Sequence, residues 1–373
     1  MRVVVVGAGI VGLSAAWWLA RQGHAPVVLD QGPIPNPLAS SFDHHRLIRL
    51  AHGEGDGRGR IIHEAYAAWE ELWRDLGARH HVETGMLLTA RAPGDWAWSC
   101  RAAFDRAGTP YEIWDRAALA ARCPFLALGP DDWGLYTREG GALLAEPILH
   151  GLAGWLRGRG VELRPDCPVE AVEPEAASAR LASGERVAGD ALVLAAGAWT
   201  GRLLPALASR LEPRRSVVAY LDPPADLAPA WRGSPSFLDF GGDGDLYLIP
   251  PMRGLGLKFG AGAHSRPGDP ATPRTLLPDE PESLLAFLRP YIRDLDRYAV
   301  SEARVCYTCY SPDERFMAGG LDEGRTVYAT GCSGQMFKFG AIVGRRLAET
   351  ATGALPAPTL ARWARGEAET LAA

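Results

Sequence analysis

The sequence VVVVGAGIVG at residues 3–12 decides the fold of this chain. A run of β-branched residues without a charge predicts a buried parallel strand. Gly7, Gly9 and Gly12 then predict a tight turn whose backbone amides can approach a pyrophosphate group. The apolar residues from Leu13 to Ala20 predict a helix directly after the turn. Strand, glycine turn and helix in this order are typical of a dinucleotide-binding unit.

A second strand, predicted at Pro26 to Leu29, completes the unit, and Asp30 follows it. An acidic residue at this place can accept hydrogen bonds from both hydroxyl groups of a ribose. Its charge would repel the extra phosphate of a 2'-phosphorylated nicotinamide cofactor. FAD and NAD both remain compatible with these residues.

Composition excludes several classes of protein. Hydrophobic residues make up 47% of the 373 residues, charged residues make up 22%, and the net charge is -5. Such a chain has material for a core but no basic stripe for nucleic acid. Residues 3–20 carry no charge, but the glycine turn inside this stretch argues against a membrane span or a signal peptide. Six scattered cysteines do not resemble a disulfide framework, so we expect a reducing, cytoplasmic location.

The rest of the sequence mixes helical and strand patterns without a repeat or a long linker. Periodicity predicts helices at residues 61–76, 95–107, 115–122, 147–156, 282–288 and 339–349. Further strands are predicted at residues 161–164, 191–195, 303–307 and 326–330, strand signals dominate residues 214–260, and residues 85–89 form an apolar segment. We therefore predict an α/β and α+β fold in which two lobes interleave along the chain.

A Rossmann-type nucleotide-binding lobe is expected from residues 1–80, 141–210 and 306–373. A mixed-sheet substrate lobe is expected from residues 81–140 and 211–305.

Four further motifs carry a family resemblance. VCYTCYSPD at residues 305–313 and TGCSGQMFKFG at 330–340 join GLGLKFG at 254–260 and RLIR at 46–49. Together they resemble the monomeric sarcosine oxidase and N-methyltryptophan oxidase family of FAD-dependent amine oxidases. The resemblance extends from the first residues to about Glu349 and selects FAD as the cofactor. It also implies the fold of D-amino-acid oxidase.

The resemblance implies that FAD is bound covalently. The attaching cysteine lies six residues before the Pro312-Asp313 pair, which makes it Cys306. A thiolate near the electron-poor flavin ring can form a thioether with a methyl carbon of that ring. Cys309, three residues later, is a competing candidate. The other FAD-binding residues that the resemblance implies are Arg46 against the flavin face, Gly197, Gly331, Gly334, Met336 and Lys338.

The resemblance also implies roles in the reaction. Lys258 matches a lysine that lies near flavin N5 and assists the reaction of reduced flavin with oxygen. Arg49 and Lys338 match a pair of cations that bind the substrate carboxylate. Tyr247, by its spacing from Lys258, matches a tyrosine of the substrate pocket.

The sequence departs from the family pattern near the expected substrate pocket. Thr308 replaces a tyrosine, Met336 replaces a glycine, and Gly262 stands where sarcosine oxidase has a histidine. His264 is displaced from that position by two residues. These departures argue against sarcosine itself as the substrate, and an aromatic or bulkier cyclic amine is an alternative.

The expected activity is oxidation of a secondary, cyclic or N-methyl amino acid to an imine, with oxygen reduced to hydrogen peroxide. The expected partners are an amino acid or amine carboxylate and molecular oxygen, and the chain is expected to be a monomer or a homodimer. One alternative is a biosynthetic dehydrogenase or desaturase that acts on a tailored amino acid or a cyclic imine. Another is a flavin-binding subunit that relays electrons within a complex.

No metal site is expected. The pairs His44-His45 and His80-His81 lack cysteine or carboxylate partners at metal-binding spacing. We predict that all four are loop residues.

Overall fold

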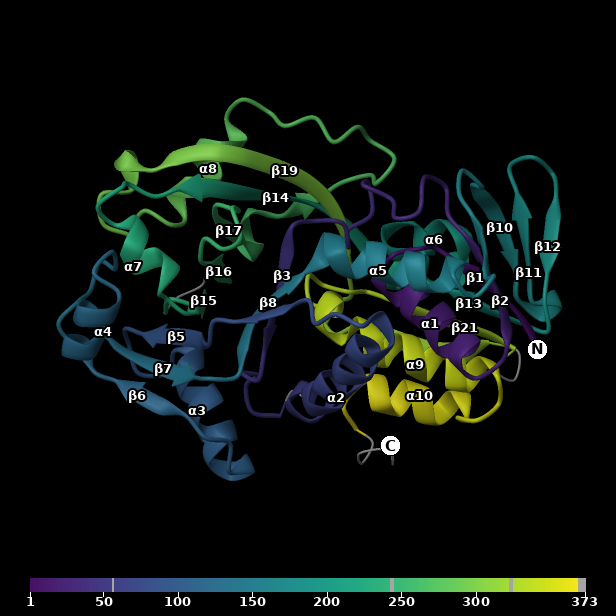
Figure 1. Ribbon diagram of the computed structural model, residues 1–373, viewed down its shortest axis with the longest axis horizontal. Coiled ribbons are helices and arrows are strands. Elements are labelled where there is room, and N and C mark those ends of the chain that lie inside the picture. Colours follow the sequence, from purple (N-terminus) through teal and green to yellow (C-terminus); the bar gives the residue numbers. More distant parts are fainter. Residues whose placement is uncertain (56, 242–244, 322–324, 368–373) are drawn as a thin grey trace.

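The computed structural model describes residues 1–55, 57–241, 245–321 and 325–367 (Figure 1). A first sheet has six strands in the order β20-β21-β13-β1-β2-β9. Its strands pair in parallel except β20, which is antiparallel to β21. Their bounds are β1 (Arg2–Val6), β2 (Ala25–Leu29), β9 (Glu162–Arg164), β13 (Ala191–Leu194), β20 (Met317–Leu321) and β21 (Thr326–Thr330).

The glycine turn joins β1 to α1 (Ile10–Arg21). This helix begins at Ile10, earlier than predicted, because Gly9 already acts as its N-cap. Gly7 has a φ of +101°, a conformation that side chains disfavour. A Cβ atom on Gly12 would lie 1.8 Å from the carbonyl oxygen of Gly7. The predicted strand, turn and helix are therefore confirmed, and two of the glycines are required by close backbone contacts.

Helices pack around this sheet. Figure 1 shows α1 together with α5 (Ala145–Arg157), α9 (Gly340–Ala351) and α10 (Ala357–Ala364) in this part of the molecule. The long α2 (Arg58–Leu76) joins the same core. Fully buried side chains of this core include Trp17, Trp69, Leu152, Val343 and Phe339. Burial of such large apolar surfaces is the main stabilising contribution to this part of the fold.

A second, mixed sheet has nine strands. Eight of them have the order β18-β14-β17-β16-β15-β5-β7-β6, and β19 pairs with β14. All neighbouring strands are antiparallel except β15 and β5. The bounds are β5 (Met86–Ala90), β6 (Glu112–Trp114), β7 (Trp133–Thr137), β14 (Glu212–Asp222), β15 (Ser236–Leu238), β16 (Leu246–Ile249), β17 (Leu257–Ala261), β18 (Arg266–Pro267) and β19 (Ala299–Tyr310). The predicted combination of α/β and mixed-sheet architecture is confirmed.

Short helices accompany the second sheet. They are α3 (Trp96–Ala107), α4 (Arg116–Arg122), α7 (Ala228–Arg232) and α8 (Glu280–Ala286). Near β14, Arg215 forms a two-point ion pair with Glu280 of α8, in which Nη2 lies 2.8 Å from Oε2. Both side chains are buried, so this contact fixes α8 against β14.

Two strands are much longer than the others. β19 extends over 12 residues, whereas the sequence predicts only residues 303–307. Its register with β14 is regular around the cysteines, with Cys306 opposite Ser216 and Cys309 opposite Pro213. Figure 1 shows β14 and β19 running side by side from the second sheet toward the first.

Two small sheets complete the fold, and one corrects a prediction. β3 (His45–Arg49), β8 (Gly140–Leu144) and β4 (His81–Glu83) form a sheet in that order. His45 and His81 therefore begin strands and are not loop residues, because each pairs with β8. The other small sheet contains β10 (Val169–Glu173), β11 (Ser178–Leu181) and β12 (Arg186–Ala188).

The division into two lobes stays a prediction. The boundary at residue 306 falls inside β19. The segment 306–373 also extends over residues 322–324 and 368–373, which lie outside the described residues. Within the described ranges, no helix combines the length and apolar character that crossing a bilayer requires.

Candidate active site

A cavity of about 650 Å³ is lined by elements of both large sheets. The glycine turn after β1 contributes Gly7 and Gly9, and β17 and β19 contribute Lys258 and Cys306. Every predicted site residue except Gly12 lines this cavity. The others are Gly7, Gly9, Asp30, Arg46, Arg49, Gly197, Tyr247, Lys258, Cys306, Gly331, Gly334, Met336 and Lys338.

At one end of the cavity, Asp30 holds the glycine turn in place. Its carboxylate accepts hydrogen bonds from the backbone N–H of Ala8 at 2.8 Å, from the N–H of Gly32 at 3.0 Å and from Asn36 Nδ2 at 2.7 Å. The carboxylate thus fixes the loops on both sides of it, a role that the sequence did not reveal.

The residues at this end fit a dinucleotide. A Cβ atom on Gly7 would lie 2.4 Å from the carbonyl oxygen of Ala195, so the turn can exist only with glycine there. The N-terminus of α1 faces this turn and favours an anion. Because the same cavity is also lined by Lys258 and Cys306, an elongated ligand such as FAD can extend from the turn to those residues.

Two of the cations that line the cavity are Arg49 and Lys338, and Tyr247 and Met336 line the same cavity. Arg49, in β3, is buried and lies over the ring of Trp96 at 5.3 Å. Lys338 is also buried, and its Nζ lies 3.2 Å from the carbonyl oxygen of Gln335. Cations in such a water-poor site are suited to binding a carboxylate.

The position of Lys338 is fixed from outside the cavity. The indole Nε1 of Trp69, in α2, donates a hydrogen bond of 2.7 Å to the backbone carbonyl of Lys338. The short helical turn Met336–Phe339 that carries Lys338 is buried throughout. This turn therefore places Lys338 on rigid backbone.

Lysine occurs at just two positions of the sequence. Of 39 lysine and arginine residues, only Lys258 and Lys338 are lysines, and both line the cavity. Arginine supplies the cation at every other basic position. An ammonium group differs from a guanidinium group in being compact and in losing its proton readily when buried. The two lysines thus mark the places where these properties can matter.

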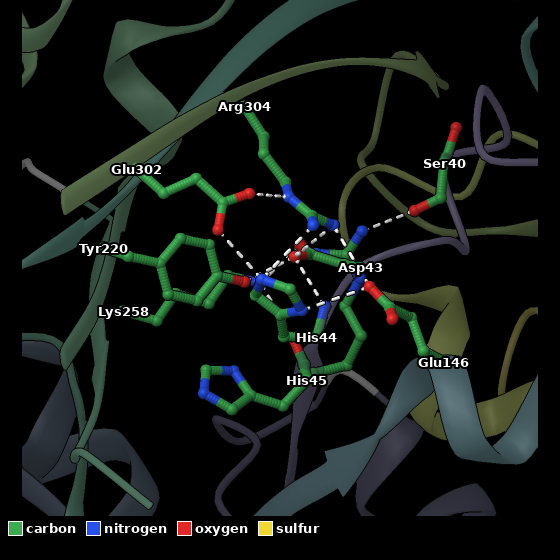
Figure 2. A network of polar contacts seen from close by, with 10 residues as sticks. Ser40, Asp43, His44, His45, Glu146, Tyr220, Lys258, Glu302 and Arg304 are labelled. Atoms are coloured by element: carbon green, nitrogen blue, oxygen red, sulfur yellow. Dashed lines mark hydrogen bonds and ion pairs between the residues drawn. The ribbon is translucent and has the colours of Figure 1, made fainter. Parts of the chain in front are cut away.

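Lys258 belongs to a buried cluster around Asp43, shown in Figure 2. Its Nζ donates hydrogen bonds to Asp43 Oδ2 at 2.6 Å and to the backbone carbonyl of His45 at 2.7 Å. Arg46 Nη1 and the Tyr220 hydroxyl also donate to the Asp43 carboxylate. The side chains of Lys258 and Asp43 are 0% and 3% exposed, so neither charge is stabilised by bulk water.

The cluster changes the protonation of its members. Burial lowers the pKa of Lys258 to about 8, and the nearby charge of Asp43 opposes this shift. Burial acts to raise the pKa of Asp43, but the charges of Arg46 and Lys258 outweigh it and hold that pKa well below its usual range. At neutral pH the cluster therefore contains one carboxylate and two cations.

A polar chain leads outward from this cluster (Figure 2). Arg304 Nη1 lies 3.7 Å from Asp43 Oδ1, and its guanidinium also contacts Glu302. His44 Nε2 lies 2.9 Å from Glu302, and His44 Nδ1 lies 3.1 Å from Glu146. Glu302 is 37% exposed, so the chain reaches the surface.

Cys306 and Cys309 have different surroundings. The pKa of Cys306 is raised by burial, an effect that the cations Arg46 and Lys258 oppose. Cys309 packs with Tyr307 and Ala198 in a small hydrophobic cluster. Both cysteines line the cavity, but of these two it is Cys306 that has cations close enough to favour its thiolate.

The departures at Gly262 and His264 have a structural explanation. A Cβ atom on Gly262 would lie 2.0 Å from Asp245 Oδ2, so the Asp245 side chain occupies the space that a larger residue would need. Gly262, Asp245 and Thr308 all line the cavity. His264 Nε2 lies 2.9 Å from the Ser283 hydroxyl, and His264 does not line the cavity.

Sequence reasoning missed several residues of this site, above all Asp43, Tyr220, Arg304 and Asp245. Asp43 carries the one available signal, because it lies three residues before Arg46 in the segment SSFDHHR. Tyr220 and Arg304 are far from it in sequence and are brought together by the pairing of β14 with β19.

Comparison with known proteins shows the family to which the chain belongs. A family model described as FAD dependent oxidoreductase matches residues 2–350. The monomeric sarcosine oxidase of Bacillus sp. (strain NS-129) is 28% identical over 94% of this chain and 92% of its own length. The N-methyl-L-tryptophan oxidase of Citrobacter koseri is 27% identical over 95% of each chain. The resemblance inferred from the four motifs is confirmed.

A solved structure supports the fold. The chain is similar to NikD, described as an unusual amino acid oxidase essential for nikkomycin biosynthesis, with a TM-score of 0.80 at 22% identity. The similarity covers 95% of this chain and 94% of that one.

Proposed function

Because the chain belongs to the FAD-dependent oxidoreductase family, we propose that it oxidises a secondary, cyclic or N-methyl amino acid to an imine with oxygen as the electron acceptor. The relatives named sarcosine oxidase and N-methyl-L-tryptophan oxidase support this substrate class. The observation that carries the proposal is the position of both lysines and of Arg49 in one cavity with the glycine turn.

The proposed reaction consists of oxidation of the amine and reduction of oxygen. The substrate loses a hydride equivalent from the carbon next to nitrogen and a proton from the nitrogen, which leaves an imine. Oxygen takes up two electrons and two protons and leaves as hydrogen peroxide. Bound FAD supplies the reversible two-electron acceptor between these halves.

The protein residues hold and orient the reactants. Arg49 and Lys338 bind the substrate carboxylate, and Tyr247 and Met336 line the pocket beside them. Fixing the substrate in this way presents one C–H bond to the acceptor. Lys258 provides a cation that favours negative charge during reduction of oxygen. Arg46, Gly197, Gly331 and Gly334 complete the proposed FAD contacts, and Cys306 is the proposed site of covalent attachment.

An anaerobic screen tests the proposal. N-methyl, cyclic and primary amino acids are mixed with the purified protein, and bleaching of the flavin absorbance is recorded. Bleaching by a secondary amino acid, followed by peroxide formation when air is admitted, is expected. Absence of bleaching by every amino acid tested would remove the proposed substrate class and favour an electron-relay subunit.

A dehydrogenase is the second candidate, and one contact favours it. The Asp43 carboxylate lies 2.6 Å from Lys258 Nζ, so the ion pair as a whole presents less positive charge to oxygen than a lone ammonium group would, although the ammonium group itself stays charged. Reoxidation by oxygen and by a quinone or dye acceptor, compared on the same reduced protein, separates the two candidates. A cytoplasmic location and a monomeric or homodimeric state remain predictions.

A further inference from the structure

We propose that Asp43 is a positioning residue that holds Lys258 in its charged form and so sets the pH range in which Lys258 assists the reaction. This inference rests on the proposed function, because it concerns the residue assigned to the oxygen step. Asp43 does not line the cavity itself and acts through its contact with Lys258.

The first support is the geometry of the ion pair. Lys258 Nζ lies 2.6 Å from Asp43 Oδ2, and its second hydrogen bond goes to the carbonyl of His45. Asp43 lies two residues before β3 and His45 is the first residue of β3, whereas Lys258 belongs to β17. The ammonium group is therefore oriented by a segment that is far from it in sequence.

The second support is the way in which the Asp43 carboxylate is held. Its Oδ1 accepts the backbone N–H of His44 at 2.8 Å, and the Tyr220 hydroxyl donates to the same oxygen. Arg46 donates to Oδ2. A buried carboxylate that accepts this many hydrogen bonds stays ionised and has little freedom to turn away.

The third support is the set of charges around Lys258. Asp43 is the one carboxylate in direct contact with it among the described residues. Burial and the charge of Arg46 in β3 both disfavour the ammonium form, while a thiolate at Cys306 of β19 would favour it. The His45 ring stays neutral near pH 7, since burial lowers its pKa to about 3, and the Tyr220 ring of β14 lies 5.7 Å from Lys258 Nζ.

Removing the carboxylate therefore has a defined consequence. With Asp43 the pKa of Lys258 is lowered only to about 8, so the ammonium form dominates at neutral pH. Loss of an opposite charge at this range typically shifts a pKa by about 1 to 3 units. Without Asp43, Lys258 would lose its proton within the neutral range.

The scarcity of lysine gives a direct measurement. Protein labelled with ¹³C at lysine Cε should show signals from Lys258 and Lys338 alone, and Lys338→Arg assigns them. In the FAD-loaded wild-type protein, Lys258 should titrate with a midpoint near pH 8. In Asp43→Asn the midpoint should fall by about 1 to 3 units, and Asp43→Glu should restore much of it.

A matched control removes another carboxylate of the same network. Glu302→Gln changes the partner of Arg304 and His44 but leaves the Asp43 contact with Lys258 intact. Its Lys258 midpoint should stay close to that of the wild type. An unchanged midpoint in Asp43→Asn, or an equal shift in Glu302→Gln, would overturn the proposal.

Kinetics connect the ion pair to the reaction. At pH 7.5 the same shift of about 1 to 3 units predicts that flavin reoxidation in Asp43→Asn slows by about 3-fold to 240-fold, and the loss should shrink as the pH is lowered. A midpoint that moves while the reoxidation rate does not would contradict the assigned role of Lys258 and leave the ion pair supported. If Asp43→Asn does not fold, the wild-type titration decides, because a Lys258 that is already neutral at pH 7 contradicts the proposal.

Discussion

Cys306 and Cys309 point to opposite faces of β19, since their positions differ by three in a regularly paired part of the strand and side chains alternate between faces at each position. Cys306 faces the cluster of Arg46 and Lys258, whereas Cys309 packs against Tyr307 and Ala198. This difference makes Cys306 the better candidate for covalent attachment of FAD.

For flavin attachment, acid precipitation of the wild-type protein should leave the yellow colour in the pellet. Cys306→Ser should release the flavin, and the matched variant Cys309→Ser should retain it. Formation of a thioether from a thiol and a methyl group would release two electrons and two protons, which oxygen would take up as hydrogen peroxide, so attachment should also require oxygen. A colourless wild-type pellet would contradict the assignment.

Replacing Lys258 with Met should slow reoxidation of the flavin more than its reduction. The lost charge acts on the oxygen step and not on hydride loss, and one preorganised charge of this kind typically contributes about 10²-fold to 10³-fold. Stopped-flow measurement of the two half-reactions checks the expectation. Equal slowing of both would mean that Lys258 shapes the cavity and does not act on oxygen.

Arg49→Ala and Lys338→Ala should each weaken binding of simple carboxylate inhibitors. A hydrogen bond to a buried charge contributes roughly 1.5 to 3 kcal/mol, or about 10-fold to 150-fold in affinity. Flavin difference spectra measure the dissociation constants. The matched amide of each substrate is the control, and oxidation of amide and acid at equal rates would show that these cations do not bind a carboxylate.

Gly262→His alone should not restore a family-like pocket. The Cβ atom would lie 2.0 Å from Asp245 Oδ2, so the carboxylate must move or the loop must shift. Combining Gly262→His with Asp245→Ala should recover the stability lost in the single variant, as measured by thermal unfolding. Equal losses in the single and double variants would show that Asp245 is not the obstacle.

His45 should make the protein sensitive to acid. Burial lowers its pKa in the folded state to about 3, below the usual histidine value of 6.5. Between these two pH values the His45 ring binds a proton in the unfolded chain but not in the folded chain. The free energy of unfolding should therefore fall by about 1.4 kcal/mol per pH unit from pH 6.5 toward pH 3. Urea unfolding of His45→Leu should lack this part of the slope. The exposed His63, changed to Leu, serves as the control.

The sequence was sufficient for the features that depend on local pattern. The residues VVVVGAGIVG predict strand, turn and helix because β-branched residues and glycines act over a few positions. By contrast, α10 was not predicted, since eight residues with an early proline give a weak periodic signal. The length of β19 was underestimated because residues on both sides of 303–307 follow no simple alternation of burial.

The residues of the site also fall into those that a local motif predicts and those that only the folded chain brings together. Lys258, Arg49 and Lys338 stand in motifs and were predicted, and the structure brings them to one cavity. Asp43 and Tyr220 meet only because the segment before β3 approaches β14 in the folded chain, and Asp245 matters only because Gly262 lies beside it. Contacts between distant segments of this kind have no signature in a single sequence.

The regular pairing of β19 with β14 from Glu302 to Tyr310 has a consequence for insertions and deletions. Glu302, Arg304 and Cys306 stand at every second position of the strand. Deleting the one residue between Arg304 and Cys306 would move every later residue of β19 back by one position. Each of their side chains would then lie on the opposite face of the strand. Cys309 would then turn toward the cluster of Arg46 and Lys258, while Cys306 would turn away. A natural variant with such a deletion would thus exchange the two thiols without altering either cysteine.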